Sequence, residues 1–140
     1  MSRVLLDTHL LLWWLKDDPR LPPSLVTELQ TDQHDVLISQ ASLWEMAIKV
    51  NLWRLSVDLT VLEQRVPDEG FQWLPISNEH LLEVAQLEPI EGHRDPFDRL
   101  LVAQCRVEPL LLFTCDRALQ AYGACVRLIT YPPRPGQASQ

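Results

Sequence analysis

The sequence predicts a single α/β domain with a mainly parallel sheet of about five strands and helices on both faces. Short apolar runs of strand length alternate along the chain with longer segments of helical periodicity. Strands separated by helices need crossover connections, and these place neighbouring strands parallel. The chain has 140 residues, of which 46% are hydrophobic and 22% charged, as expected for one globular domain with its own core.

The first half of the chain supplies two predicted strands and four helices. Prolines mark the boundaries of two of these helices. Asp18-Pro19 ends one helix, and Pro22-Pro23 begins the next, because proline is tolerated in the first turn of a helix. The predicted elements are, in order, the strand 4–6, the helices 10–16 and 22–31, the strand 36–38, and the helices 41–52 and 59–66.

The second half continues the alternation and then ends in a polar tail. Its predicted elements are the strand 73–76, the helices 78–86 and 95–107, the strand 110–113, a short helix from 116 and the strand 126–130. Pro75 places the third strand near an edge, because proline cannot donate to a sheet ladder, and Asn78 is the predicted cap of the helix that follows. We assign the domain to residues 1–131 and predict a frayed Pro/Gly/Ser/Gln tail at 132–140.

Composition excludes several classes of protein. No apolar run approaches the roughly 18 residues of a membrane span, and Asp7 comes too early for a secretory signal peptide. Cys105, Cys115 and Cys125 show no CxxC spacing and are predicted to be reduced thiols of a cytoplasmic protein. The net charge of −7 argues against a protein that coats nucleic acid by bulk electrostatics, but it leaves room for a nuclease that carries positive charge as bound metal.

Four acidic residues are predicted to meet beyond the carboxyl ends of the strands, where parallel sheets bind ligands. Asp7 and Asp116 follow strands, Asp98 lies in the first turn of a helix, and Glu45 lies one turn into another. Crowded carboxylates repel one another unless a cation joins them, and all-oxygen ligation suits one or two Mg²⁺ or Mn²⁺ ions. The four histidines lack HxxxH spacing and are not expected to be ligands.

Each acid also has a purely structural interpretation. Asp7 and Asp116 occupy positions typical of helix N-caps, and Asp98 fits the third position of a near capping box. Glu45 interrupts an apolar segment, and an i,i+4 pair with Lys49, which contributes a few tenths of a kcal/mol, is thin compensation for burying it. If the acids do share metal, they can hydrolyse a phosphodiester with metal-activated water. No nucleophile elbow, P-loop or GxGxxG motif suggests another chemistry.

Four segments of the sequence resemble the PIN-domain ribonucleases and, within them, the VapC-type toxins of bacterial toxin–antitoxin pairs. The segments are LLDTHLLLW (5–13), ISQASLWEMAIK (38–49), HRDPFDRLLVAQ (93–104) and FTCD (113–116). The resemblance runs from 4 to about 128. It implies a three-layer α/β/α PIN-like fold, a catalytic metal-binding quartet of Asp7, Glu45, Asp98 and Asp116, cleavage of RNA, a cognate antitoxin that blocks the site, and a homodimer.

The neighbours of the acids have predicted supporting roles. Three side-chain hydroxyls are predicted to orient the carboxylates or a metal-bound water: those of Thr8, Ser39 and Thr114. The alternative is that they form only local turn or cap hydrogen bonds. Asp95 is expected to cap its helix and to help position the metal-binding carboxylates without contacting the metal itself.

Basic residues lie next to the acids in the sequence. Lys49, Arg94, Arg99 and Arg117 are predicted either to contact substrate phosphates or to hold the carboxylates by ion pairs, and one arginine can do both.

The five tryptophans are divided between core and surface. Periodicity predicts that Trp44 and Trp73 are in the core. Trp13, Trp14 and Trp53 are not all expected to be buried, so at least one is predicted at a protein interface.

Two other functions stay open at this point. Structure-specific DNA nucleases use the same acid-cluster chemistry, and the preference for RNA comes only from the resemblance. A non-catalytic protein-binding module, in which the acids merely cap helices and form ion pairs, would bind no metal.

Overall fold

The structure, a computed structural model, describes residues 2–31 and 33–130. Within them, five strands form one sheet in the order β3-β2-β1-β4-β5, with every pair parallel. The strands are β1 (Ser2–Leu6), β2 (His34–Ser39), β3 (Gln72–Leu74), β4 (Leu111–Thr114) and β5 (Val126–Leu128). The predicted parallel sheet is confirmed, with β1 at its centre and β3 at one edge.

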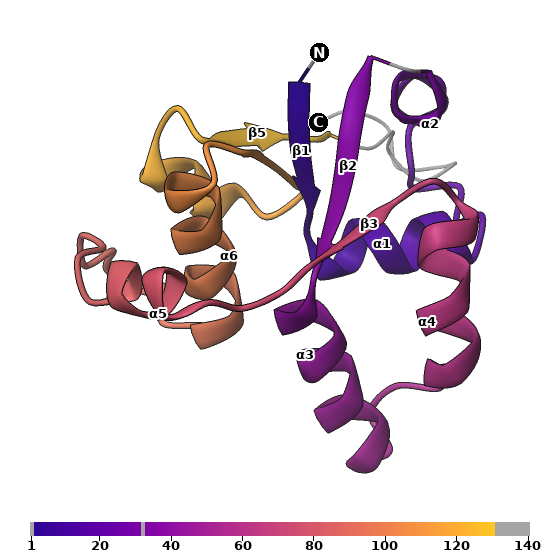
Figure 1. The fold of residues 1–140 in the computed structure, drawn as a ribbon, viewed down its shortest axis with the longest axis horizontal. Coiled ribbons are helices and arrows are strands. Elements are labelled where there is room, and N and C mark those ends of the chain that lie inside the picture. The colour runs from indigo at the N-terminus through magenta and orange to yellow at the C-terminus, as the bar shows by residue number, and fades with distance from the viewer. Residues whose placement is uncertain (1, 32, 131–140) are drawn as a thin grey trace, which may run out of the picture.

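Helices cover both faces of the sheet and make the three layers of an α/β/α fold. They are α1 (Thr8–Leu15), α2 (Pro23–Gln30), α3 (Gln40–Asn51), α4 (Leu59–Asp68), α5 (Asn78–Val84), α6 (Pro96–Val107) and the 3₁₀ helix η1 (Arg117–Tyr122). In Figure 1, α5 and α6 lie on one side of the strands and α1, α2 and α4 on the other, while α3 continues from the carboxyl end of β2.

The central strand β1 divides the core in two because successive side chains of a strand point to opposite faces. Val4 and Leu6 belong to the apolar cluster beneath α1, α2 and α4. Leu5 belongs to the cluster beneath α6. All three are essentially inaccessible to solvent, so β1 is held on both faces and fixes the position of the residue that follows it, Asp7.

Two predictions about single residues are wrong. Trp44 is 56% exposed, because the buried face of α3 is formed by Ala41, Ser42, Glu45 and Met46. Asn78 does not cap α5; Ser77 does. Its hydroxyl accepts from the His80 backbone N–H at 3.3 Å, and His80 Nδ1 accepts from the Ser77 N–H at 3.0 Å.

Other predictions hold or lie beyond the described residues. Trp13 and Trp14 are both buried and Trp53 is 95% exposed, as expected if the three are not all in the core. Over 2–31 and 33–130, every helix is too short or too polar to cross a bilayer. The predicted tail at 132–140 lies outside the described residues.

Candidate active site

Asp7 is held rigidly at the carboxyl end of β1. Its backbone N–H donates to the carbonyl of Phe113 at 3.1 Å, which ties it to the end of β4. Its Oδ1 caps α1 by accepting from the Leu10 N–H at 2.9 Å, and its Oδ2 accepts from the Thr114 hydroxyl at 2.5 Å. The side chain is 3% exposed. Burial raises the pKa of Asp7 above its ordinary value, although both hydrogen bonds act in the opposite direction.

Glu45 is buried on α3 with a partner for each carboxylate oxygen. Its Oε1 lies 2.8 Å from the Thr8 hydroxyl, which also lies 2.9 Å from Ser42 Oγ. A threonine hydroxyl has one proton, so it donates to the carboxylate and accepts from the serine. Glu45 Oε2 accepts from Lys49 Nζ at 2.9 Å. The i,i+4 pair with Lys49 therefore exists, and the Thr8 hydroxyl is hydrogen-bonded to the Glu45 carboxylate.

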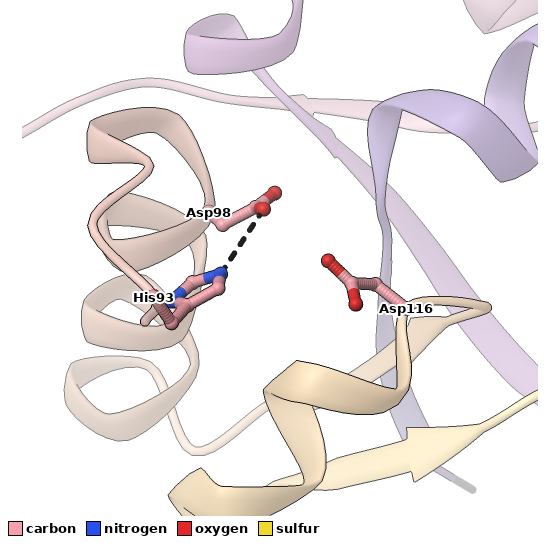
Figure 2. A group of neighbouring side chains, drawn as sticks. All are labelled: His93, Asp98 and Asp116. Atoms are coloured by element: carbon pink, nitrogen blue, oxygen red, sulfur yellow. Dashed lines mark hydrogen bonds and ion pairs between the residues drawn. The ribbon is translucent and has the colours of Figure 1, made fainter. Parts of the chain in front are cut away.

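Asp98 and Asp116 face each other from two different elements, as Figure 2 shows. Asp95 caps α6 by accepting from the N–H groups of Phe97 and Asp98 at 2.9 and 3.0 Å, so the Asp98 carboxylate is not used for capping. Burial, and next the negative charge of Asp95, raise the pKa of Asp98 to about 6, to which Asp7 and Glu45 contribute as well. Asp116 is exposed at the start of η1, where its Oδ1 accepts from the Ala118 N–H at 3.0 Å.

The four acids line a single cleft of about 430 Å³. They come from the end of β1, the middle of α3, the first turn of α6 and the residue before η1, which are far apart in the sequence. Asp7 and Asp116 are also helix caps, so the structural and the functional interpretation of each apply together. The remaining residues that line the cleft are Thr8, His9, Trp13, Arg20, Lys49, Asp95 and Cys115.

The three candidate hydroxyls do not share one environment. Thr8 contacts Glu45 and Thr114 contacts Asp7, both inside the cleft wall. The contacts of Ser39 lead away from the acids: its hydroxyl accepts from the Ala41 N–H at 2.9 Å and donates to Gln104 Oε1 at 2.6 Å. Ser39 is thus a helix cap and a link to α6.

The four candidate basic residues are likewise divided. Lys49 lines the cleft and is paired with Glu45. Arg94 and Arg99 line an adjacent pocket of about 400 Å³, and Arg99 Nη1 donates to the Tyr122 hydroxyl at 2.8 Å. Arg117 is exposed on η1, one residue after Asp116.

Sequence reasoning missed two residues beside the acids: Arg20 lines the cleft, and His93 lines the adjacent pocket. His93 is 8% exposed, with Nε2 3.4 Å from Asp98 Oδ2 and Nδ1 3.1 Å from the Tyr122 hydroxyl. The HxxxH test looks for two ligands on one helix and overlooks a single histidine in a loop. Arg20 reaches the cleft from the loop between α1 and α2, paired with Asp18 and stacked 4.7 Å over the Trp13 ring.

The donor set fits a divalent cation. Five carboxylates, those of the four acids and Asp95, line the cleft together with Lys49 and Arg20, and each of these two cations is already paired with an acid. Burial, and next the negative charge of the neighbouring carboxylates, raise the pKa of Asp98 to about 6. Burial raises the pKa of Cys115 to about 11, so the cysteine of the cleft is a neutral thiol. The donors available to a cation are therefore mainly carboxylate oxygens, which suit Mg²⁺ and Mn²⁺.

Comparisons with known proteins agree with this architecture. The profile of the PIN domain family matches residues 4–124. A structure of FitAB bound to an IR36 DNA fragment matches with 20% identity and a TM-score of 0.66, covering 89% of this chain and 94% of that one. VapBC2 from Rickettsia felis, bound to promoter DNA, matches with 15% identity and a TM-score of 0.68, covering 94% and 100%. A toxin–antitoxin complex from Klebsiella pneumoniae matches with 19% identity and a TM-score of 0.61, covering 89% and 95%. At these identities the likeness concerns the fold. Among curated proteins, none matches this sequence.

Proposed function

This chain belongs to the PIN domain family, whose members are in general nucleases, and on that premise we propose that it is a Mg²⁺- or Mn²⁺-dependent endoribonuclease, the toxin of a toxin–antitoxin pair. The observation that carries the proposal is the convergence of Asp7, Glu45, Asp98 and Asp116 in one cleft. A row of helix caps would leave these carboxylates at separate helix ends. Burying two of them together is costly unless a cation offsets their charge.

One or two divalent ions bound by these acids would activate water and stabilise the leaving oxygen of a phosphodiester. The protein supplies fixed positions for the ligands. Thr114 and Thr8 orient Asp7 and Glu45 by hydrogen bonds at 2.5 and 2.8 Å. Asp95 takes over the capping of α6 and so leaves the Asp98 carboxylate to the cleft.

Positive charge at the rim would position the substrate. Lys49 and Arg20 line the cleft itself, and Arg94 and Arg99 line the adjacent pocket. Phosphate contacts of this kind fix the register of a nucleic acid without reading its bases. We assign these four residues to phosphates flanking the scissile bond, with Arg117 nearby on η1.

The decisive experiment measures metal-dependent cleavage of RNA. Purified protein is incubated with total RNA and Mg²⁺ or Mn²⁺, with and without EDTA, and the cut ends are mapped. We expect cleavage only with free metal, and none in Asp7→Asn or Asp98→Asn. Asp35→Asn, an exposed position on β2, is the matched control and should stay active. Retained cleavage in both cleft variants would refute the assignment of the acids.

The same samples separate the alternatives. Labelled single-stranded DNA and duplex DNA, tested in parallel, should resist cleavage if the enzyme is a ribonuclease, whereas preferential cutting of DNA would identify a DNA nuclease with the same acid cluster. A non-catalytic binding module would cut neither and, by calorimetry, would bind no divalent metal.

A protein partner is part of the proposal. The solved structures with this fold include toxin–antitoxin complexes, which supports a cognate antitoxin that blocks the cleft. Trp53, almost fully exposed after α3, and Trp44 support a protein interface such as that of a homodimer. Sedimentation velocity over a range of concentrations tests the homodimer, and a single monomeric species throughout would contradict it.

We propose the cytoplasm as the compartment of this enzyme. Its RNA substrate is present there, and Cys105, Cys115 and Cys125 are free thiols in the structure, as expected in a reducing compartment.

A further inference from the structure

We propose that His93 is a metal ligand, so that the cleft holds one divalent ion through an imidazole nitrogen as well as carboxylate oxygens. This inference rests on the proposed function, because it assumes that Asp98 and Asp116 bind metal. It adds a ligand of a different chemical class, and with it a preference for Mn²⁺ over Mg²⁺.

The first support is the geometry of three side chains. Ligand atoms of His93, Asp98 and Asp116 all lie within 4.8 Å of one another. Figure 2 shows that His93 and Asp98 come from the stretch that leads into α6, and that Asp116 faces them from the segment before η1. Two atoms that bind the same ion at about 2.1 Å lie roughly 3 to 4 Å apart. A small movement of the exposed Asp116 side chain would bring the set to that spacing.

The second support is the way in which His93 is held. Its ring is buried and lies edge-to-face against Tyr122, with centroids 5.7 Å apart. Nδ1 lies 3.1 Å from the Tyr122 hydroxyl, which also accepts from Arg99 Nη1 at 2.8 Å. Metal-binding histidines are typically held in this manner: one ring nitrogen is hydrogen-bonded to a fixed partner, and the other faces the ion.

The contact between His93 and Asp98 supports a ligand more than a simple hydrogen-bonding role. Nε2 lies 3.4 Å from Asp98 Oδ2, which is long for a hydrogen bond between an imidazole and a carboxylate. If Nδ1–H donates to Tyr122, the lone pair of Nε2 points toward the carboxylates, and a cation between these atoms would satisfy both.

An imidazole changes which cation the cleft prefers. Mg²⁺ favours oxygen ligands and gains little from a nitrogen donor, whereas imidazole suits first-row transition metals better. We therefore expect His93→Gln to weaken Mn²⁺ binding about tenfold and Mg²⁺ binding much less.

Electron spin-echo envelope modulation of bound Mn²⁺ tests the ligand directly and does not depend on activity. The wild-type protein should show the ¹⁴N modulation of a coordinated imidazole, and labelling with ¹⁵N-histidine should replace it with the ¹⁵N pattern. His93→Gln should lose the signal. His9→Gln is the matched control, because His9 is an exposed histidine that lines the cleft of the four acids, and this variant should keep the signal.

The possible outcomes separate this inference from the proposed function. Bound Mn²⁺ without ¹⁴N modulation, or a signal that disappears in His9→Gln and persists in His93→Gln, would overturn the inference and leave the acid cluster intact. Failure of the wild-type protein to bind Mn²⁺ would overturn both. The isotope experiment uses the wild-type protein, so the test stands even if His93→Gln does not fold.

Discussion

The carboxylate of Asp98 opposes folding of the metal-free protein at neutral pH. Its pKa is raised to about 6 by burial and by Asp95, Asp7 and Glu45, whereas an aspartate in an unfolded chain has a pKa of about 3.9. Between these values the folded protein keeps a proton that the unfolded chain has released. The free energy of unfolding therefore falls as the pH rises through this window and stays lower above about pH 6.

Asp98→Asn should stabilise the metal-free protein, and the gain should depend on pH. We expect the free energy of unfolding to rise by on the order of 1 to 2 kcal/mol near pH 7.5 and to change little near pH 4, where the aspartic acid is already neutral. Urea denaturation in EDTA at the two pH values measures this. Asp35→Asn serves as the control, and equal effects at both pH values would contradict the explanation.

Thr114 lowers the pKa of Asp7 through the hydrogen bond that its hydroxyl donates to Oδ2. Thr114→Val keeps the shape of the side chain but removes the donor, so the pKa of Asp7 should rise further and protons should compete better with metal. We expect divalent-ion affinity to fall about tenfold, as measured by calorimetry. Thr27→Val, on the surface of α2, is the control and should leave the divalent-ion affinity unchanged. An unchanged affinity in Thr114→Val as well would contradict the prediction.

Single residues of the cleft differ in how well the sequence predicts them. Asp7 and Asp116 directly follow or nearly follow strands, and the geometry of parallel sheets places such residues at one edge. His93 and Arg20 lie in loops, and their proximity to the acids depends on how those loops are folded, which no local pattern encodes. Ser39 is the last residue of β2, yet its hydroxyl turns toward Gln104, because a position at the end of a strand does not specify which side of the sheet edge its side chain faces.

At the level of elements, Ser39 connects β2, α3 and α6. It caps α3 and donates to Gln104, a fully buried residue whose amide also approaches the Pro75 carbonyl and His80. Ser39→Ala removes the cap and leaves the buried Oε1 of Gln104 without the hydroxyl that donates to it, which should cost about 1 to 3 kcal/mol of stability.

Metal binding distinguishes this structural role from a role in the site. Chemical denaturation of Ser39→Ala should show the loss of stability, whereas calorimetry should give a divalent-ion affinity within about twofold of the wild type. A tenfold loss of affinity is the size expected when a residue that hydrogen-bonds to a metal ligand is removed. Such a loss would show that Ser39 supports the metal site after all.

The order and type of the elements could be predicted from the sequence, but the orientation of α3 could not. Leu43, Trp44, Met46 and Ala47 make α3 apolar on several sides, so periodicity alone does not reveal the buried face. The structure turns Glu45 inward, and Trp44 is left at the surface in edge-to-face contact with Phe97 at 4.9 Å. For α5, Ser77 and Asn78 are both good caps, and the bond from His80 back to Ser77 determines which one is used.

At the scale of the whole molecule, metal should act as a folding ligand. An ion that binds only the folded protein adds RT ln(1 + [L]/Kd) to stability, about 2.7 kcal/mol at a hundredfold excess over Kd. Mn²⁺ should therefore raise Tm in thermal unfolding, by several degrees for a domain of this size. The rise should vanish in Asp7→Asn and persist in Asp35→Asn, and an equal rise in all three proteins would point to binding elsewhere.

The strand order has a consequence for protein synthesis. β1 is synthesised about a hundred residues before β4, its neighbour in the sheet. Asp7 and Asp116 meet only after that pairing, which is recorded in the register of Leu6 with Phe113. A polypeptide that stops before β4 therefore lacks Asp116 and the strand that positions it, so the cleft of four acids cannot form.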